Sequence, residues 1–103
     1  LTVLISYKDT RILLTGDLEE KIEKELIKKV NLGQVDILKI GHHGSKSSSS
    51  MEFLQTVTPD VAVIQVGKNS FGHPAGEVIE RLKEIGVKKI YRNDLDGKVE
   101  FVF

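Results

Sequence analysis

The sequence predicts one α/β domain with a mixed sheet and about three helices. Two observations lead to this fold class. Short apolar runs rich in β-branched and aliphatic residues, typical of buried strands, alternate with longer segments whose apolar residues recur at helical spacing. The chain also has only 103 residues, which is too short for two separate hydrophobic cores. Strands that alternate with helices are typical of units in which the strands lie parallel.

Composition excludes several classes of function. The chain has no cysteine, so disulfides and thiolate metal sites are excluded. Its formal net charge is +0, so no overall basic field attracts nucleic acid, and any contact with a polyanion has to be local. Because the chain begins with Leu and enters strand-like sequence at once, we expect it to be a piece of a longer polypeptide.

The N-terminal third predicts a hairpin and then a helix. Residues 1–7 and 11–15 have strand character and flank a polar turn. Apolar residues then recur at helical spacing from 18 to 30, and the Glu and Lys residues between them are assigned to a solvated face. Gly33 follows as a residue suited to ending the helix.

The remainder predicts four strands and two helices. Residues 51–57 form a short helix that Ser50 would cap, although the serine tract before it also has the composition of a linker. Residues 75–85 form the second helix, and the Asp-Gly pair near residue 97 favours a tight hairpin between the last two strands. The predicted strands span residues 35–40, 61–66, 87–92 and 98–103.

The candidate site centres on Gly41-His42-His43-Gly44-Ser45, directly after the strand at 35–40. Ligands of α/β sheets bind beyond the carboxyl ends of the strands, and neutral imidazole is the commonest protein ligand for transition metals. The flanking glycines allow the backbone to bend sharply and keep bulk away from the rings.

Two further residues follow apolar strands in the same way. Asp17 comes after the strand at 11–15, where an Asp is more often a helix cap than a ligand, and His73 follows the strand at 61–66. In one sheet of parallel strands these residues would converge with His42 and His43 on one edge. Such a set suits a zinc or manganese site that activates water.

With the strands placed, the chain resembles the C-terminal half of a metallo-β-lactamase-fold domain, most closely that of ComEC-type DNA-uptake competence proteins. The resemblance covers nearly the whole chain. It rests on residues 12–19, on residues 38–45 with the serine tract that follows, and on Gly72-His73-Pro74 before a helix. It implies that residues 1–103 form half of an αββα sandwich, with the His-x-His-x-Asp-His motif of this superfamily in the other half.

Carried over by position, the resemblance implies roles for individual residues. Asp17 would be the carboxylate that bridges two metals, and His42 the last histidine ligand, with His43 as the rival for that role. His73 and Ser45 would lie around the metals or contact the substrate. Apart from the resemblance, Lys46 is a candidate substrate-binding residue, because its cation could contact a phosphate.

At the level of function, the resemblance implies a zinc- or manganese-dependent hydrolase of phosphodiesters, with DNA as substrate. Its partners would be the other half of the domain and a membrane channel that holds this domain outside the cytoplasm. Because the main ligand motif is absent, we expect the chain alone to be inactive and its uncovered apolar sheet face to favour a homodimer. Two other interpretations remain: a non-catalytic module that holds phosphate, a DNA backbone or a partner protein, and a plain α/β domain whose histidines stabilise loops.

Overall fold

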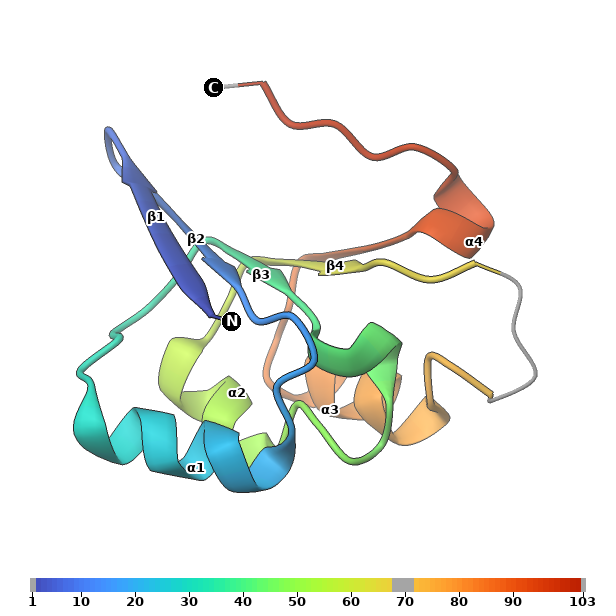
Figure 1. Ribbon diagram of the computed structural model, residues 1–103. Helices are drawn as coiled ribbons and strands as arrows, with labels where there is room; N and C mark the ends of the chain where they lie inside the picture. The colour runs from blue at the N-terminus through green and yellow to red at the C-terminus, as the bar shows by residue number, and fades with distance from the viewer. Residues whose placement is uncertain (1, 68–71, 103) are drawn as a thin grey trace.

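The computed structural model describes residues 2–67 and 72–102, and this part of the chain forms a mixed five-stranded sheet with helices packed on one face (Figure 1). The α/β class and the mixed sheet are therefore confirmed. The main elements are β1 (Val3–Tyr7), β2 (Thr10–Leu14), α1 (Glu20–Lys29), β3 (Ile37–Lys39), α2 (Met51–Val57), β4 (Val61–Ile64), α3 (Gly76–Glu84) and β5 (Lys89–Arg92). Two single-turn elements are η1 (Gly41–Gly44) and α4 (Asn93–Asp96).

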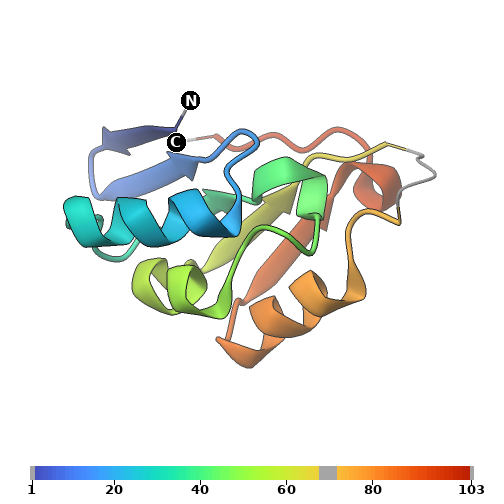
Figure 2. The same cartoon turned by 60° about the horizontal axis from the view of Figure 1, so that its bottom comes forward.

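The strands lie in the sheet in the same order as in the sequence. β1 pairs antiparallel with β2 through the predicted hairpin, and β2, β3, β4 and β5 are parallel to one another. Since crossovers between parallel strands are right-handed, a strand order that always advances in one direction puts every crossover helix on the same face. Figure 2 shows α1, α2 and α3 side by side across that face.

The hydrophobic core lies between this face and the three helices. Alternate strand residues point into it, so Leu13 and Leu38 are buried while their neighbour Ile12 faces the other side and is half-buried. Burial of one such leucine contributes about 1.5–3 kcal/mol. The helices supply Phe53, Leu54, Val57, Val78 and Leu82.

The helix boundaries confirm one predicted cap and correct the other. The amide of Phe53 donates to Oγ of Ser50 at 3.3 Å, so the serine tract is a capped loop and not a linker. α1 begins at Glu20 with Glu19 as its N-cap, so Asp17 does not cap this helix. The reason is a separate turn before the helix, in which the amide of Leu18 donates to the carbonyl of Thr15 at 3.1 Å.

The predicted C-terminal hairpin is wrong. Instead of a tight turn, the residues after β5 form the single turn α4, which the Arg92 side chain and backbone hold through Asp94 and Asp96. The Asp96 carboxylate accepts the Arg92 amide at 2.8 Å, and that amide is therefore engaged within the turn. Residues 98–102 form no strand and pass across the face of the sheet that the helices leave uncovered (Figure 1).

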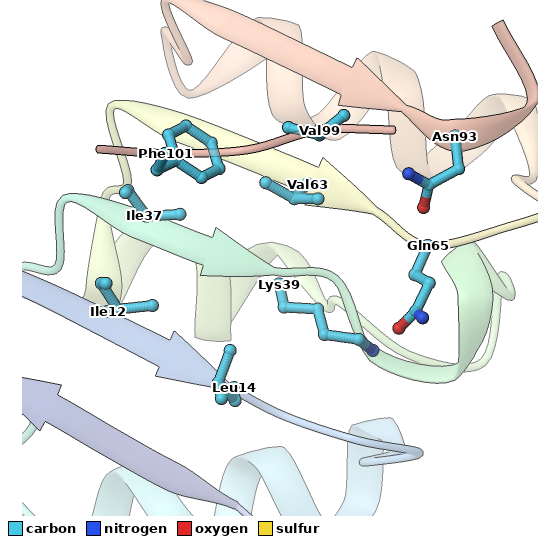
Figure 3. Close-up of a pocket in the computed structure, with 9 residues that line it drawn as sticks. All are labelled: Ile12, Leu14, Ile37, Lys39, Val63, Gln65, Asn93, Val99 and Phe101. Atoms are coloured by element: carbon cyan, nitrogen blue, oxygen red, sulfur yellow. The ribbon is translucent and has the colours of Figure 1, made fainter. Parts of the chain in front are cut away.

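That uncovered face is apolar, as the sequence predicted, and the C-terminal segment covers part of it. Val99 and Phe101 lie over it and line an open pocket of about 380 Å³ (Figure 3), while the ring of Phe101 meets Tyr91 edge-to-face at 5.7 Å. Val3 and Ile5 of β1 share this face and are exposed; Phe103 lies outside the described residues. The pocket is lined by Ile12, Leu14, Ile37, Lys39, Val63, Gln65, Asn93, Val99 and Phe101.

None of the helices in residues 2–67 and 72–102 has the length and apolar character that a membrane span requires.

The exposed part of this face predicts self-association. Ile5, the middle residue of β1, is 41% exposed. Ile5→Lys should weaken a homodimer at least about tenfold, because burial of one such side chain contributes roughly 1.5–3 kcal/mol. Val30→Lys is the matched control, since Val30 is 47% exposed at the end of α1 on the opposite side of the sheet. Light scattering over a concentration series measures the association, and a monomer at every concentration would contradict the prediction.

Candidate functional site

Three loops meet at the carboxyl edge of the parallel strands. The amide of His42, in the turn after β3, donates to the carbonyl of Gly16 in the loop after β2, at 2.9 Å. The amide of Ala75, in the segment after β4, donates to the carbonyl of Gly44 at 2.8 Å. The rings of His42 and His73 then lie edge-to-face, with their centroids 5.8 Å apart. The predicted convergence of these loops on one edge is confirmed.

Two glycines allow this close approach. A Cβ atom at Gly41 would lie 2.8 Å from the carbonyl oxygen of Leu18, and one at Gly44 would lie 2.6 Å from Cβ of Pro74. Gly44 also has φ of +83°, a conformation that L side chains rarely adopt. Both glycines of the motif are therefore required by packing between loops, in addition to the bend that the sequence predicted.

Both histidines of the turn have a strained backbone. His42 has φ 49° and ψ 43°, and His43 has φ 54° and ψ 25°, which places both residues in the left-handed region. Non-glycine residues are uncommon there, and such residues cluster at functional sites because the surrounding structure must hold them in place. The hydrogen bonds and close packing of the neighbouring loops supply that constraint here.

The structure separates His42 from His43. The His42 side chain is half-buried beside the loop after β2, and its Nδ1 lies 3.4 Å from a carboxylate oxygen of Glu19. That contact lacks hydrogen-bond geometry, so within residues 2–67 and 72–102 the buried Nδ1 has no hydrogen-bond partner. The contacts with Glu19 and His73 place the His42 ring in the space between the loops after β2 and β4.

His43 has different surroundings. Its side chain is exposed, and Nδ1 lies 2.6 Å from the carbonyl oxygen of Gln65 at the end of β4. Because a carbonyl only accepts, Nδ1 of His43 must carry the proton of this bond. His43 also lines a shallow hollow with Gln65 and Asn93, which does not include Asp17 or His42. The bond to β4 helps to hold the strained turn.

Asp17 lies in the loop after β2 and is exposed. Its charge acts on Lys39, the last residue of β3: burial lowers the pKa of the Lys39 ammonium, and the negative charge of Asp17 partly opposes this effect. Thr15 fastens the base of the loop, since its buried hydroxyl donates to the Lys39 carbonyl at 2.6 Å. The carboxylate is thus presented at the same edge as His42.

The hydroxyl of Ser45 stabilises the turn that precedes the serine tract. Ser45 is buried, and its hydroxyl is within hydrogen-bond distance of the Ser47 hydroxyl, at 2.9 Å, and accepts the Ser47 amide. Lys46 between them is exposed. A role for Ser45 in substrate contact stays a prediction, and its hydroxyl is engaged in shaping the turn.

Sequence reasoning missed Glu23. It was assigned with the other charged residues of α1 to the solvated face, yet it is 1% exposed and its carboxylate accepts the amides of Ser49 and Ser50. A signal was present in the spacing, because Glu23 precedes Leu26 and Ile27 by three and four residues and so falls on the apolar stripe.

The donors at this edge do not complete a metal site by themselves. In the part of the chain that the structure describes, no group of three or more His, Cys, Asp or Glu side chains is placed to hold a metal ion. The edge therefore brings together imidazole and carboxylate groups from separate loops, and any metal held there needs further ligands.

The chain is similar in sequence to segments of several known proteins. No protein-family model matches the chain. The chain is 38% identical over 90 residues to ComE operon protein 3 of Bacillus subtilis, a match that covers 86% of the chain and 12% of that protein. It is 43% identical over 81 residues to Recombination protein 2 of Haemophilus influenzae, with 78% and 10% covered.

A third relative is Competence protein ComA of Neisseria gonorrhoeae, 42% identical over 93 residues, with 87% of the chain and 13% of that protein covered. The chain is homologous to a short segment of each of these proteins. It spans about an eighth of the length of ComE operon protein 3 and of Competence protein ComA. The similarity therefore concerns one segment of much longer molecules.

Gly44→Ala should lower the free energy of unfolding by roughly 2–4 kcal/mol, because an L residue in a left-handed conformation costs about 1–2 kcal/mol and the new Cβ would also meet Pro74. Gly76→Ala is the control. It adds the same methyl group at the start of α3, where no atom lies within 4 Å, and should cost nothing. Urea unfolding measures both; equal stability of the two variants would contradict the packing argument.

Asp17→Asn should lower the pKa of Lys39 further, because it removes the negative charge that opposes the effect of burial. Titration of the Lys39 side-chain resonances by NMR measures the shift. Asp60→Asn is the matched control, since Asp60 precedes β4 at the opposite edge of the sheet and should leave the Lys39 titration unchanged. An unchanged Lys39 pKa in Asp17→Asn would show that the carboxylate lies elsewhere.

Proposed function

We propose that this chain is part of a metal-dependent phosphodiesterase that acts on DNA during competence-related uptake, and that it forms half of a metallo-β-lactamase fold. The observation that carries the proposal is the meeting of the Asp17, His42 and His73 loops at one sheet edge. It is supported by the homology to ComE operon protein 3 and to Competence protein ComA.

The residues at this edge fit part of a zinc or manganese site. Imidazole and carboxylate are donors that both metals accept, and Asp17 and His42 come from adjacent loops joined by the bond from the His42 amide to Gly16. Since the described residues bring no third such donor into place, the other ligands would come from the other half of the domain. A metal held there would supply the positive charge that makes water a nucleophile for phosphorus.

The chain's own residues would position the reactants. We assign Nε2 of His42 as the ligand atom, because Nδ1 is buried 3.4 Å from the Glu19 carboxylate and is therefore not accessible to a metal. His73 limits rotation of that ring by edge-to-face contact. Lys46 is exposed in the same turn segment and would attract a phosphate of the DNA backbone.

The remainder of the proposed protein would contain the His-x-His-x-Asp-His half and a membrane channel, with this domain outside the cytoplasm. The uncovered apolar sheet face is the surface on which the other half would pack, because two-layered sandwiches join their sheets face to face. Val99 and Phe101 already occupy part of that face.

A second candidate function is a non-catalytic module that holds a phosphate or a DNA backbone. It is favoured by the incomplete donor set of the described residues and by the exposed Lys46 next to a turn rich in hydroxyl groups. In that case DNA binding would need no metal and would be lost in Lys46→Ala.

Zinc binding by the purified chain tests the proposal. We expect weak binding and no DNA cleavage, because a catalytic zinc takes about three protein ligands and this edge supplies fewer. His42→Ala should weaken zinc binding at least about tenfold. His43→Ala, the matched control, should leave it nearly unchanged, because the His43 ring lies at Gln65 in a hollow that includes neither Asp17 nor His42. Calorimetric titration measures both affinities.

Two outcomes would contradict these expectations. Equal losses in the two histidine variants would remove the assignment of His42. Robust, chelator-sensitive cleavage of DNA by the chain, abolished in Asp17→Ala, would show that the chain is a complete hydrolase.

A further inference from the structure

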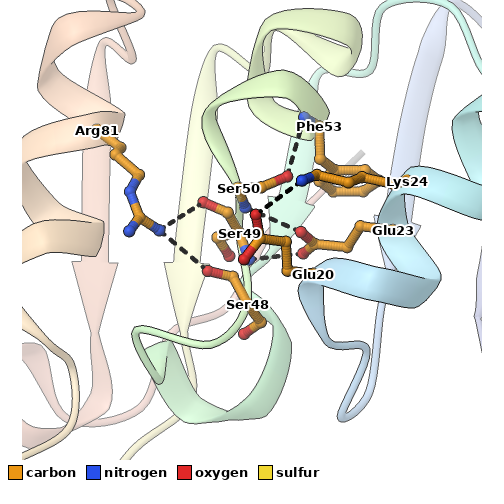
Figure 4. Close-up of polar contacts among 8 residues, drawn as sticks. All are labelled: Glu20, Glu23, Lys24, Ser48, Ser49, Ser50, Phe53 and Arg81. Carbon is orange, nitrogen blue, oxygen red and sulfur yellow. Dashed lines mark hydrogen bonds and ion pairs between the residues drawn. The ribbon is translucent and has the colours of Figure 1, made fainter.

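A buried carboxylate of α1 holds the segment that follows the histidine turn. Glu23 accepts the Ser49 amide on one carboxylate oxygen at 2.6 Å and the Ser50 amide on the other at 2.9 Å (Figure 4). Burial raises the pKa of the Glu23 carboxyl, and the two amide bonds oppose that effect. Loss of either hydrogen bond would leave a buried acid without its partner, which is costly in free energy. Hydrogen bonds from amides to a carboxylate are also stronger than those between neutral groups, so Glu23 restrains the segment strongly.

An arginine of α3 holds the same segment from the other side. Nη1 of Arg81 donates to the carbonyl of Ser48 at 3.3 Å and to the carbonyl of Ser49 at 3.1 Å. Figure 4 shows Glu23 and Arg81 reaching the serines from opposite helices. The charges match the backbone, since the carboxylate meets N–H groups and the guanidinium meets C=O groups. Ser49 is held by both and has φ of 55°, a conformation that needs such support.

The clamped segment is tied in turn to the histidine turn. The hydroxyl of Ser48, which is fully buried, donates to the carbonyl of Gly41 at 2.9 Å. The Ser48 amide donates to the Ser45 carbonyl at 3.1 Å, and the Ser45 amide donates to the His42 carbonyl at 2.9 Å. The peptide groups on both sides of His42 are therefore bonded, directly or through Ser45, to Ser48.

We propose that Glu23 and Arg81 are positioning residues, which clamp residues 48–50 between α1 and α3 and, through Ser48, fix the turn that carries His42. The proposal deepens the proposed function and rests on it for the role of His42 as a ligand. It assigns a use to the two charged side chains that contact this buried segment, neither of which touches the candidate ligand atoms.

The same contacts would also be present if the clamp only joined α2 to its neighbours, since Ser50 is the N-cap of α2. The two roles differ at Ser48. A clamp that acts on His42 requires the hydrogen bond from Ser48 to Gly41, whereas an anchor for α2 does not. A double-mutant cycle between Glu23 and Ser48 therefore separates them.

The cycle uses the 103-residue chain with Glu23→Gln, Ser48→Ala and the double variant, and Glu25→Gln as the matched control on the exposed side of α1. Amide hydrogen exchange is followed at His42 and, as a reference for general stability, at Asp36, whose amide donates to Arg11 at the opposite edge of the sheet. We expect each single change to speed exchange at His42 about tenfold more than at Asp36, and the double change to add little. Glu25→Gln should alter neither amide.

Additive effects in the cycle, or equal acceleration at His42 and Asp36, would overturn the proposal. If Glu23→Gln does not fold, Arg81→Lys replaces it in the same cycle, because lysine keeps the charge but loses the planar fork of donors. Exchange reports the clamp whether or not metal binds.

Zinc titration of the same variants gives the functional arm. Glu23→Gln and Ser48→Ala should each raise the zinc dissociation constant about tenfold, a loss typical of residues that orient a ligand histidine. If the unaltered chain binds no zinc, the proposed metal site fails and the exchange cycle still decides the clamp. If zinc binds equally in all variants while exchange changes, positioning of His42 by the clamp is overturned and the metal site stands.

Discussion

The arrangement of this protein depends on one topological constraint: each strand joins the sheet beside the strand that precedes it in the chain. Because every parallel crossover is right-handed, this order leaves the crossover helices α1, α2 and α3 together on one face of the sheet. It also places the loops after β2, β3 and β4 next to one another at the carboxyl edge. The core, the uncovered apolar face and the candidate site all follow from that order.

Backbone contacts, more than side-chain contacts, assemble the site. The turn after β3 is joined to its neighbours by main-chain hydrogen bonds to Gly16 and from Ala75, and glycines at both ends of the turn let the loops come this close. The charged side chains Glu23 and Arg81 likewise act on backbone groups. The backbone conformation of the turn therefore sets the directions of the two imidazoles. The His42 ring lies against His73, and the His43 ring lies at the carbonyl of Gln65.

Local patterns in the sequence were sufficient for the five strands of the sheet, the first hairpin, the cap at Ser50 and the convergence of His42 and His73, because each depends on spacing or on strand direction. These patterns failed where contacts with residues distant in the sequence determine the structure. Glu23 looks like a surface residue until Ser49 and Ser50 are brought against it from more than twenty residues away. The C-terminal hairpin failed because Val99 and Phe101 pack across the sheet, an outcome that strand propensity cannot distinguish from pairing with β5.

The position of Arg81 late in the chain bears on the order of folding during synthesis. A sheet that grows by adding each strand to the preceding one can form progressively as the chain emerges, since its pairings join consecutive segments. Glu23 and the serines are then present early, but the arginine that completes their clamp, and the histidine that contacts His42, arrive only after β4. The emerging chain could therefore pair β2, β3 and β4 before its site is complete, and the turn that carries the paired histidines would be among the last parts to become rigid.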